Sequence, residues 1–599
     1  MPIPIPLLPL TGLLTFELVA GGKSHDNSAY QVHAITVTKG INRISEACIE
    51  LVDGDPTTGN FTAIDSNYFK PGQPIEVQAG YENSNQPIFK GIVVSLGLAT
   101  RGGQGTVLTV LCKDEAVKMT GSRVIRSFPP QPTSDALQTV VSQYGGISAS
   151  IAPTSGVQNN LVQYNTTDWD FIVTQAEANG QVVISDMGKL ATVALATASR
   201  ASVGLVYGTN VLDFSLRIDA RTQFASVTAQ AWSATQQQEL QATARPPGLT
   251  LPGDLTSAEL ATAVGQQTYP IRTAADVDQP TLQALADGYL AQRTLALLQG
   301  TVDTEGTSTA VPGTMASLAG FATHFNGLAI ISGVRHTIAE GNWKTQLSLG
   351  TDEQWFAGRY PNVIEPVGVN GPASGIQGLY SAVVKAIQPD PEGGFRVQVM
   401  VAGLAGSELW VRLTQPYASA GVGLYFYPEI GDEVVLGFLG DDVRCPAILG
   451  SLYSKERAPA YPPDEKNTKK AIVTSSKLTL EFDENDKKIT LTTPGNNKLV
   501  ISDAGKGLLL MDQQQNTITL SDSGIELVST SSVRISAAND IALESQNGTI
   551  TISGSCGVAL KGLDISASAT GQLTLSSDAE SELSSTGETV VKGTMVRIN

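Results

Sequence analysis

The chain has 599 residues, of which 41% are hydrophobic and 16% are charged, so several globular domains are expected rather than a disordered chain. Its net charge of −18 repels phosphate groups, which argues against nucleic acids and anionic lipid surfaces as partners. The four cysteines (Cys48, Cys112, Cys445 and Cys556) stand singly, so the sequence lacks the spacing of a zinc ribbon or a redox dithiol.

The N-terminal stretch MPIPIPLLPLTGLL is apolar, but it lacks a basic start and is interrupted by prolines. It predicts neither a signal peptide nor a membrane span. We therefore expect the chain to fold in the bacterial cytoplasm and to leave the cell by a route other than general secretion.

The first 356 residues predict two consecutive regions. Residues 1–125 contain short runs of alternating polar and apolar residues, such as 31–39 and 74–81, which are typical of half-buried antiparallel strands. Residues 126–356 add helical patterns, including one over about 279–299, before strands resume at 327–350. We predict a first β domain over 1–125 and a mixed helical and β domain over 126–356.

A Gly- and Pro-rich linker is expected over 357–377, followed by a compact β unit over 378–453. Five strand-like runs fall within this unit, a size and number that suit a small closed barrel. A charged, Pro-rich stretch over 454–470 is expected to be a second linker.

The tail, residues 471–599, differs in character because apolar residues recur there in pairs two positions apart. The pairs used for prediction are Leu478/Leu480, Ile489/Leu491, Leu499/Ile501, Leu508/Leu510, Ile518/Leu520, Ile525/Leu527, Val533/Ile535, Ile541/Leu543, Ile550/Ile552, Val558/Leu560 and Leu573/Leu575. Each pair places two side chains on one face of a short strand, and the Ser, Asn, Asp and Gly residues between pairs favour turns. Such a short repeat is typical of a β-helix.

One chain wound in this way could not cover its own apolar stripe, because each repeat offers only two inward residues and few large side chains. Three chains wound together could cover it, each contributing one face of a triangular prism. We therefore predict an intertwined three-chain β-helix over 471–599 with the paired residues at its core.

The segment 410–453 closely resembles the oligonucleotide/oligosaccharide-binding (OB) domain of VgrG proteins and phage baseplate spikes. The matching positions are Trp410, Arg412, Gln415, Pro416, Pro428, Glu429, Gly431, Asp432, Glu433, Val434, Gly440, Asp441, Pro446, Gly450, Ser451 and Tyr453. Residues 164–184 and 327–350 are also similar to strands and a helix of the hub of this family. The resemblance therefore extends over nearly the whole chain.

This resemblance implies a homotrimeric spike of a contractile injection system, with tube-like β-barrel hub domains, an OB-fold neck and a C-terminal needle. The implied partners are inner-tube (Hcp-like) subunits, baseplate proteins, a PAAR-type tip protein, cargo effectors and, transiently, a target membrane. The 17 residues of 454–470 are too few for the lysozyme domain of some phage needles. The last histidine is His336, so a histidine-bound iron apex is not expected. A separate tip protein would then dock on Met595, Val596, Ile598 and Asn599.

The sequence predicts no catalytic, cofactor-binding or metal-binding residue. His25, His33, His324 and His336 are the only histidines, and adjacent Ser24, His25 and Asp26 cannot form a catalytic relay unaided. The alternative is a tailspike-like glycan depolymerase that uses paired carboxylates of the tail. Those acids fall mainly at predicted turns such as 483–486, which favours a solvated role. Type VI secretion, an extracellular injection particle and a phage tail all remain possible as the machine.

Overall fold

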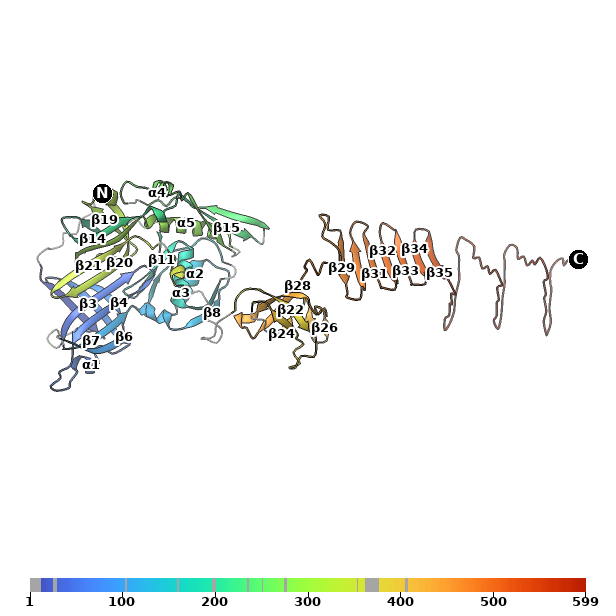
Figure 1. Ribbon diagram of the computed structural model, residues 1–599, viewed down its shortest axis with the longest axis horizontal. Coiled ribbons are helices and arrows are strands. Elements are labelled where there is room, and N and C mark those ends of the chain that lie inside the picture. Colours follow the sequence, from blue (N-terminus) through green and yellow to red (C-terminus); the bar gives the residue numbers. More distant parts are fainter. Residues whose placement is uncertain are drawn as a thin grey trace. The chain divides into compact units, whose positions relative to one another are not determined.

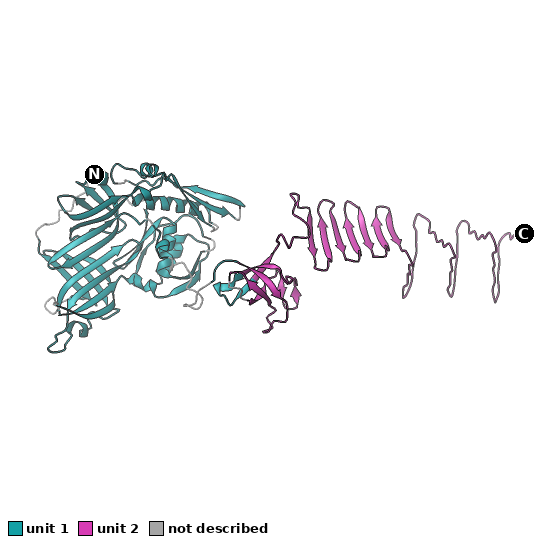
Figure 2. Cartoon of the chain, in the orientation of Figure 1, with its two compact units in different colours: residues 1–379, 437–447 teal, residues 380–436, 448–599 magenta. Residues whose placement is uncertain are grey.

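The computed structural model of the protein describes residues 12–24, 30–102, 105–158, 161–195, 201–233, 236–249, 252–273, 277–352, 354–360, 376–403 and 408–598. The chain divides into two compact units, residues 1–379 with 437–447 and residues 380–436 with 448–599 (Figure 2). Strands outnumber helices in both units, which confirms the expected mainly β fold with some helix.

The first unit is organised around one sheet of thirteen strands (Figure 1). These are β1 (Leu14–Ala20), β2 (Lys23–Ser24), β3 (Gln31–Gly40), β4 (Arg43–Val52), β5 (Pro74–Tyr81), β6 (Gln86–Arg101), β7 (Gly105–Lys113), β13 (Ala201–Val206), β14 (Val211–Ile218), β18 (Leu298–Glu305), β19 (Met315–Ala319), β20 (Gly327–Ala339) and β21 (Asn342–Leu349). Their order is β14-β18-β21-β20-β3-β4-β7-β6-β5-β1-β2, while β19 joins β20 to β13. Because β3 pairs with β20, the two predicted hub regions share one sheet.

The alternation of residues in these strands explains where the core forms. Ile35 and Val37 of β3 are buried, while Thr36 between them is partly exposed. Ile49 and Leu51 of β4 are also completely buried. Successive side chains of a strand point to opposite faces, so one face of the sheet is apolar and the other polar. Burying each such side chain contributes about 1.5–3 kcal/mol.

A second group of elements lies mainly between β7 and β20 in the sequence. They are η1 (Glu115–Thr120), β8 (Arg123–Ser127), α2 (Thr133–Val141), β9 (Ser148–Ser150), β10 (Val162–Thr167), α3 (Asp168–Ala178), β11 (Gln181–Asp186), β12 (Lys189–Ala194), η3 (Ala220–Thr222), β15 (Ser226–Ser233), β16 (Gln238–Thr243), α4 (Ser257–Ala263), β17 (Thr268–Thr273), α5 (Gln279–Leu295) and η4 (Thr323–Phe325), with α1 (Thr62–Asp65) and α6 (Phe356–Arg359) outside this range. The Thr167 hydroxyl accepts a hydrogen bond from the Asp170 N–H at 3.1 Å and so caps α3.

Two glycines bring the end of α3 against α5. Gly180 has a φ of 67° and follows α3, and a Cβ on Gly288 of α5 would lie only 2.3 Å from the Gly180 Cα. Any side chain at Gly288 would therefore push these two elements apart.

Five strands of the barrel region close on themselves in the order β22-β23-β24-β28-β27. They are β22 (Tyr380–Ala386), β23 (Val397–Val401), β24 (Glu408–Leu413), β27 (Glu433–Phe438) and β28 (Pro446–Leu452), with β25 (Ala418–Ser419), β26 (Val422–Gly423) and η6 (Leu439–Asp441) in the connections. Val384, Val399 and Val411 are completely buried inside. The small closed barrel predicted for 378–453 is confirmed.

The tail forms a seven-stranded sheet in which each strand pairs antiparallel with the next in sequence. The strands are β29 (Lys469–Val473), β30 (Thr479–Asp483), β31 (Lys488–Thr492), β32 (Lys498–Ser502), β33 (Gly507–Met511), β34 (Thr517–Ser521) and β35 (Gly524–Val528). Residues with positive φ (Lys477, Lys487, Asn496, Lys506 and Gln515) lie in the five connections from β29 to β34. The strands from Lys469 to Val528 pair within the chain in this sheet. The winding of three chains around one another, predicted from residue 471, stays a prediction. Residues 529–598 contain no strand.

Candidate functional site: an exposed apolar face

The C-terminal sheet arranges its large apolar side chains in two columns that run across the strands. Cross-strand pairing defines them, as Leu480 lies opposite Leu491 and Leu491 opposite Leu499. The first column contains Ile472, Leu480, Leu491, Leu499, Leu510, Ile518 and Leu527, and the second contains Phe482, Ile489, Ile501, Leu508, Leu520 and Ile525. Because the columns are two residues apart on each strand, they share one face.

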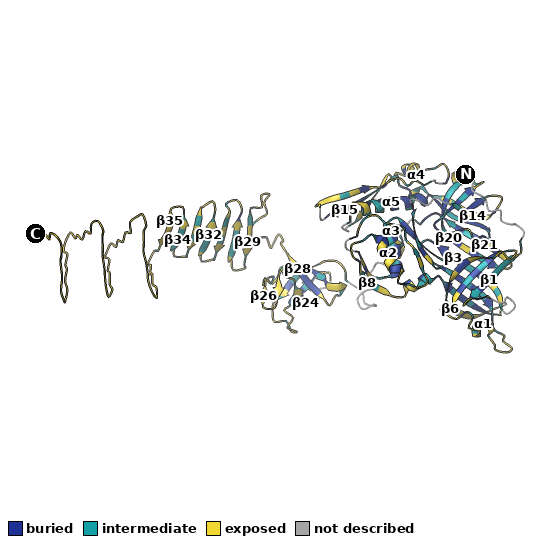
Figure 3. Cartoon of the chain, turned by 180° about the vertical axis from the view of Figure 1, so that it is seen from behind, coloured by how far each residue is buried: buried dark blue, intermediate teal, exposed yellow. Residues whose placement is uncertain are grey.

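The column residues are open to solvent, and Figure 3 colours most of the strands β29 to β35 as intermediate or exposed. Leu510 is 46% exposed and Ile525 is 78% exposed, although both belong to the columns. A groove of about 920 Å3 follows the first column. The opposite face is mostly polar, although its central row, Glu481, Thr490, Val500, Leu509 and Thr519, includes two apolar residues. A continuous apolar surface of this kind marks an interaction site.

The predicted needle residues fall into two groups in the structure. Those from Leu480 to Leu527 lie in the two columns, while Leu478 precedes β30. Sequence reasoning paired only aliphatic residues and therefore missed Phe482, which occupies the second column. The remaining predicted residues are exposed and lie beyond the last strand: Val533, Ile535, Ile541, Leu543, Ile550, Ile552, Val558, Leu560, Leu573 and Leu575. Met595, Val596 and Ile598 are also exposed, and Asn599 lies outside the described residues.

Ion pairs join the first two strands of this sheet, and one hydrogen bond ties the second strand to the preceding linker. Lys469 Nζ lies 2.8 Å from a Glu481 carboxylate oxygen and 2.7 Å from an Asp483 carboxylate oxygen. The Tyr461 hydroxyl donates a hydrogen bond to Glu481. The Lys469 ammonium holds the pKa of the Asp483 carboxyl below its usual range. Lys470 is paired with Glu484 at 2.6 Å, so the acids of this turn anchor the strands.

The barrel residues predicted from the family motif occupy turns and strand ends. Gly431 has a φ of 87°, and its N–H donates to the Val384 carbonyl at 2.8 Å. The Glu429 N–H donates to the Asp432 carboxylate at 2.8 Å, and Asp432 also pairs with Arg457 at 2.5 Å. Gln415 Nε2 donates to the Phe426 carbonyl at 2.9 Å. These contacts shape the turns that close the barrel.

The other motif positions also lie on the strands of the barrel or in the segments between and after them. Trp410 and Arg412 lie on β24, Glu433 and Val434 on β27, and Pro446, Gly450 and Ser451 on β28, while Pro416, Pro428, Gly440, Asp441 and Tyr453 lie between or after the strands. Val434 and Pro446 are buried, whereas Tyr453 is 77% exposed. The motif therefore describes the barrel and its turns.

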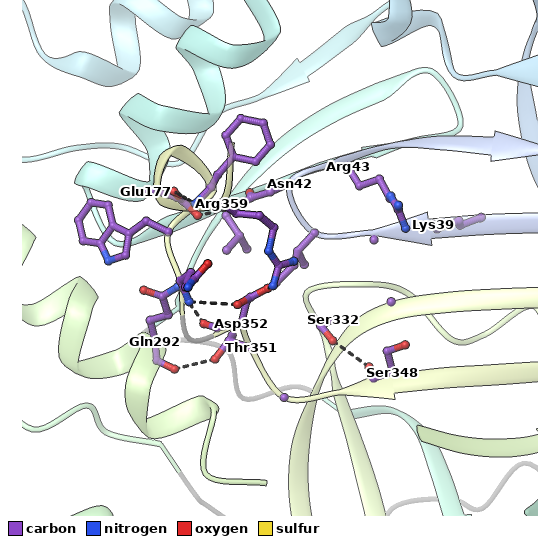
Figure 4. A pocket seen from close by; sticks show the side chains of 18 of the residues that line it. Lys39, Asn42, Arg43, Glu177, Gln292, Ser332, Ser348, Thr351, Asp352 and Arg359 are labelled. Atoms are coloured by element: carbon purple, nitrogen blue, oxygen red, sulfur yellow. Dashed lines mark hydrogen bonds and ion pairs between the residues drawn. The ribbon is translucent and has the colours of Figure 1, made fainter. Parts of the chain in front are cut away.

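The first unit contains a polar cavity of about 1400 Å3 that sequence reasoning missed (Figure 4). The Glu177 carboxylate accepts hydrogen bonds from Asn42 Nδ2 and from the Phe356 N–H, both at 2.8 Å. Asn42 Oδ1 in turn accepts from the Val183 N–H at 2.8 Å. Burial raises the pKa of Glu177 to about 7. Because residues 42, 177 and 356 are far apart in sequence, no local sequence pattern could indicate that they meet at this cavity.

The histidines do not assemble a reactive site within the part of the chain that the structure describes. His336 is buried, its Nδ1 lies 3.0 Å from the Thr345 hydroxyl, and burial lowers its pKa to about 3. His25 and Asp26 of the considered Ser-His-Asp run lie outside the described residues. Among described residues, no group of three or more His, Cys, Asp or Glu side chains is placed to hold a metal ion.

The described residues form strand-rich domains and a C-terminal sheet whose apolar face none of them covers, which defines a class of β protein suited to assembly with other chains. The chain belongs to the family described as Alg8 N-terminal domain, whose model matches residues 11–340. A second family model, described as the type VI secretion system/phage-baseplate injector OB domain, matches residues 380–453. The expected resemblance to VgrG-like hub-spike proteins is confirmed.

Individual proteins are similar to different shares of the chain. The "Actin cross-linking toxin VgrG1" of Vibrio cholerae is 35% identical over 78 residues, which cover 13% of this chain and 7% of the toxin. A tail protein from Neisseria meningitidis is 16% identical, covering 57% of this chain and 98% of that protein with a TM-score of 0.42. An Escherichia coli type VI secretion component is 12% identical, covering 73% of this chain and 99% of that protein with a TM-score of 0.37. No helix in the described ranges is long and apolar enough to cross a membrane.

Proposed function

We propose that three copies of this chain form the central hub and spike of a contractile injection machine. The observation that carries the proposal is the pair of exposed apolar columns on the C-terminal sheet. Leaving apolar surface in water costs about 25 cal/mol per Å2, so these columns favour association. Each strand contributes at most two column residues, and three narrow sheets facing one axis would enclose a slender triangular core.

In this proposal the parts of the chain have distinct tasks. The first unit joins the inner tube (Hcp-like subunits) to the baseplate, and the barrel forms the neck. The C-terminal needle pierces a target membrane when the sheath contracts, and carries a tip protein and cargo effectors. The trimer assembles in the bacterial cytoplasm and leaves only with the fired particle. It performs mechanical work without catalysis, and its acidity excludes nucleic acid as a partner.

Light scattering coupled to size-exclusion chromatography tests this proposal directly. The purified chain is expected to have three times its mass of 62.7 kDa, independent of concentration over the micromolar range. A folded, stable monomer would contradict the proposal, because its apolar columns would then remain exposed. A dimer would contradict the triangular arrangement.

The end of the chain is proposed to hold a separate PAAR-type tip protein. Met595, Val596 and Ile598 present apolar side chains, with Ile598 91% exposed. Deleting the last four residues is expected to release the tip protein in a pull-down while leaving the trimer intact. Retention of the tip by the shortened chain would place the docking surface elsewhere.

A further inference from the structure

The polar cavity of the first unit has no role in the proposed function, although it is large and bordered by many elements. Its volume of about 1400 Å3 exceeds the ~300–1,000 Å3 of a typical small-molecule pocket. The turn between β3 and β4, the strands β20 and β21, and the helices α3, α5 and α6 all contribute to its lining. These dimensions suit an extended peptide segment better than one small molecule.

This cavity is basic, although the chain as a whole is acidic. Its lining contains six basic but only four acidic side chains, whereas the chain has a net charge of −18. Each of the four acids already has a partner within the chain. The pairs are Glu46 with Lys113, Asp352 with Arg359, Glu177 with Asn42, and Asp170 with Thr167. The surplus positive charge therefore stays available to a ligand.

Two guanidinium groups of the lining have no partner. Arg43 of β4 (Figure 4) and Arg335 of β20 are exposed, and neither side chain forms a hydrogen bond or ion pair with any described residue. Their strands lie on either side of β3, so about 10 Å separates them across the sheet. Between them Gly40 of β3 pairs with Gly333 of β20, and neither has a side chain to fill the space. A ligand can therefore approach the backbone between the two arginines.

A third hydrogen-bond donor of the lining also lacks an acceptor. The Trp355 indole Nε1–H is buried and has no hydrogen-bond partner in the part of the chain that the structure describes. The indole packs against the Tyr289 ring, with centroids 5.8 Å apart, so its position is held from behind. Because a buried donor without an acceptor is unfavourable, an oxygen atom of a ligand would stabilise this arrangement.

We propose that this cavity binds an extended acidic peptide segment of another protein. Arg43 and Arg335 pair with two carboxylates of the segment, and the Trp355 Nε1–H donates to one of its backbone carbonyls. A guanidinium group can donate two parallel hydrogen bonds to one carboxylate, and clusters of arginines recognise acidic motifs in this way. An extended segment advances about 3.3 Å per residue, so acidic residues two to four positions apart would reach both arginines.

Fluorescence anisotropy with the full-length chain tests this proposal. The probe is a fluorescein-labelled octapeptide of alternating Glu and Ala, and the comparison peptide has Gln in place of each Glu. The Glu peptide is expected to bind and the Gln peptide to bind far more weakly. Arg43→Gln and Arg335→Gln should each weaken binding of the Glu peptide about tenfold, because each removes a charge-assisted pair.

Two further variants make the test specific to the cavity. Trp355→Phe keeps an aromatic ring against Tyr289 but removes the N–H, so binding should weaken without loss of folding. Arg272→Gln removes the same charge from β17, outside the cavity, and should leave binding unchanged. Circular dichroism of every variant checks that the fold is retained.

Several outcomes would overturn the proposal. These are no binding of the Glu peptide to the wild type, equal binding of the Glu and Gln peptides, and equal binding by the wild type and the double arginine variant. Tripolyphosphate serves as a competitor, and if it binds more tightly than the peptide, the site is one for a small polyanion instead. Light scattering on the same samples separates this site from the proposed function. A trimer that ignores the peptide contradicts only the site, whereas a monomer that binds it contradicts only the proposed trimer.

Discussion

The hub sheet and the C-terminal sheet use the same two-residue alternation, but they differ in what covers the apolar face. In the hub, Ile35 and Ile49 are at most 1% exposed because other strands of the same chain pack over them. In the C-terminal sheet, Leu510 and Ile525 are 46% and 78% exposed, since the chain supplies no second layer within the described residues. The hub therefore buries its apolar face within its own chain, whereas the apolar face of the C-terminal sheet would be covered only in the proposed trimer.

This difference follows from connectivity. Hub strands that are distant in sequence, such as β3 and β20, become neighbours, and the sheet can curve around a shared core. The C-terminal strands follow one another through short turns, and each pairs only with its neighbours in the sequence. A single sheet of this kind can bury its apolar face only against another element or chain.

The largest expected effect is a charge placed in the apolar columns. Leu508→Asp or Leu510→Asp would bury three like charges near one axis, at a cost of several kcal/mol per charge. Both variants are expected to be monomeric by light scattering. Leu509→Asp is the matched control, because Leu509 lies between them on the opposite face, in register with Thr519. Equal loss of trimer in all three variants would contradict the assigned face.

A core truncation in the hub is expected to have a smaller effect of a different kind. Ile49→Ala leaves a cavity beneath β4 and should lower the hub's free energy of unfolding by about 2–5 kcal/mol. Trp343 belongs to the same core, so its fluorescence in a denaturant titration reports the loss. The loss should not depend on protein concentration, and the variant should remain trimeric. A concentration-dependent loss would mean that this core is completed by another copy.

The barrel and the apolar repeat could be predicted from the sequence because both are local patterns. Five strand-like runs with a specific motif define the barrel, and the i, i+2 pairs identify the column residues from Leu480 to Leu527. The pairing of the tail strands within the chain was not predicted. Three of the left-handed turn residues are Lys477, Lys487 and Lys506, whereas the usual signal for such turns is Gly or Asn.

Long-range pairing sets the other limit on what the sequence could predict. Periodicity shows that β3 and β20 are strands, but contains no information on their partnership. For the same reason the buried Glu177 could not be singled out, because its two hydrogen-bond donors, Asn42 and Phe356, lie 135 and 179 residues away. Phe482 was missed for a simpler reason, since an aromatic residue replaced the expected aliphatic one.

The smallest expected effect concerns Glu177, and it separates the hub from the C-terminal sheet by pH. Burial raises its pKa from 4.5 to about 7. The folded hub therefore binds this proton more tightly than the unfolded chain, and its contribution to the free energy of unfolding falls as pH rises through this window. In total, the free energy of unfolding falls by about 3 kcal/mol. This loss is complete above the pKa of Glu177 in the folded hub, and the stability is regained at acidic pH.

Denaturant unfolding of the hub at pH 5, 6, 7 and 8 measures this effect, with Glu177→Gln as the control because it cannot titrate there. The stability of wild type minus that of Glu177→Gln should decline steadily from pH 5 to pH 8. Other titrating groups are common to both chains and cancel in this difference. A difference that stays constant across the range would show that Glu177 is already ionised in the folded hub at pH 5. The Asn42 and Phe356 N–H groups would then stabilise the buried carboxylate fully against its loss of water.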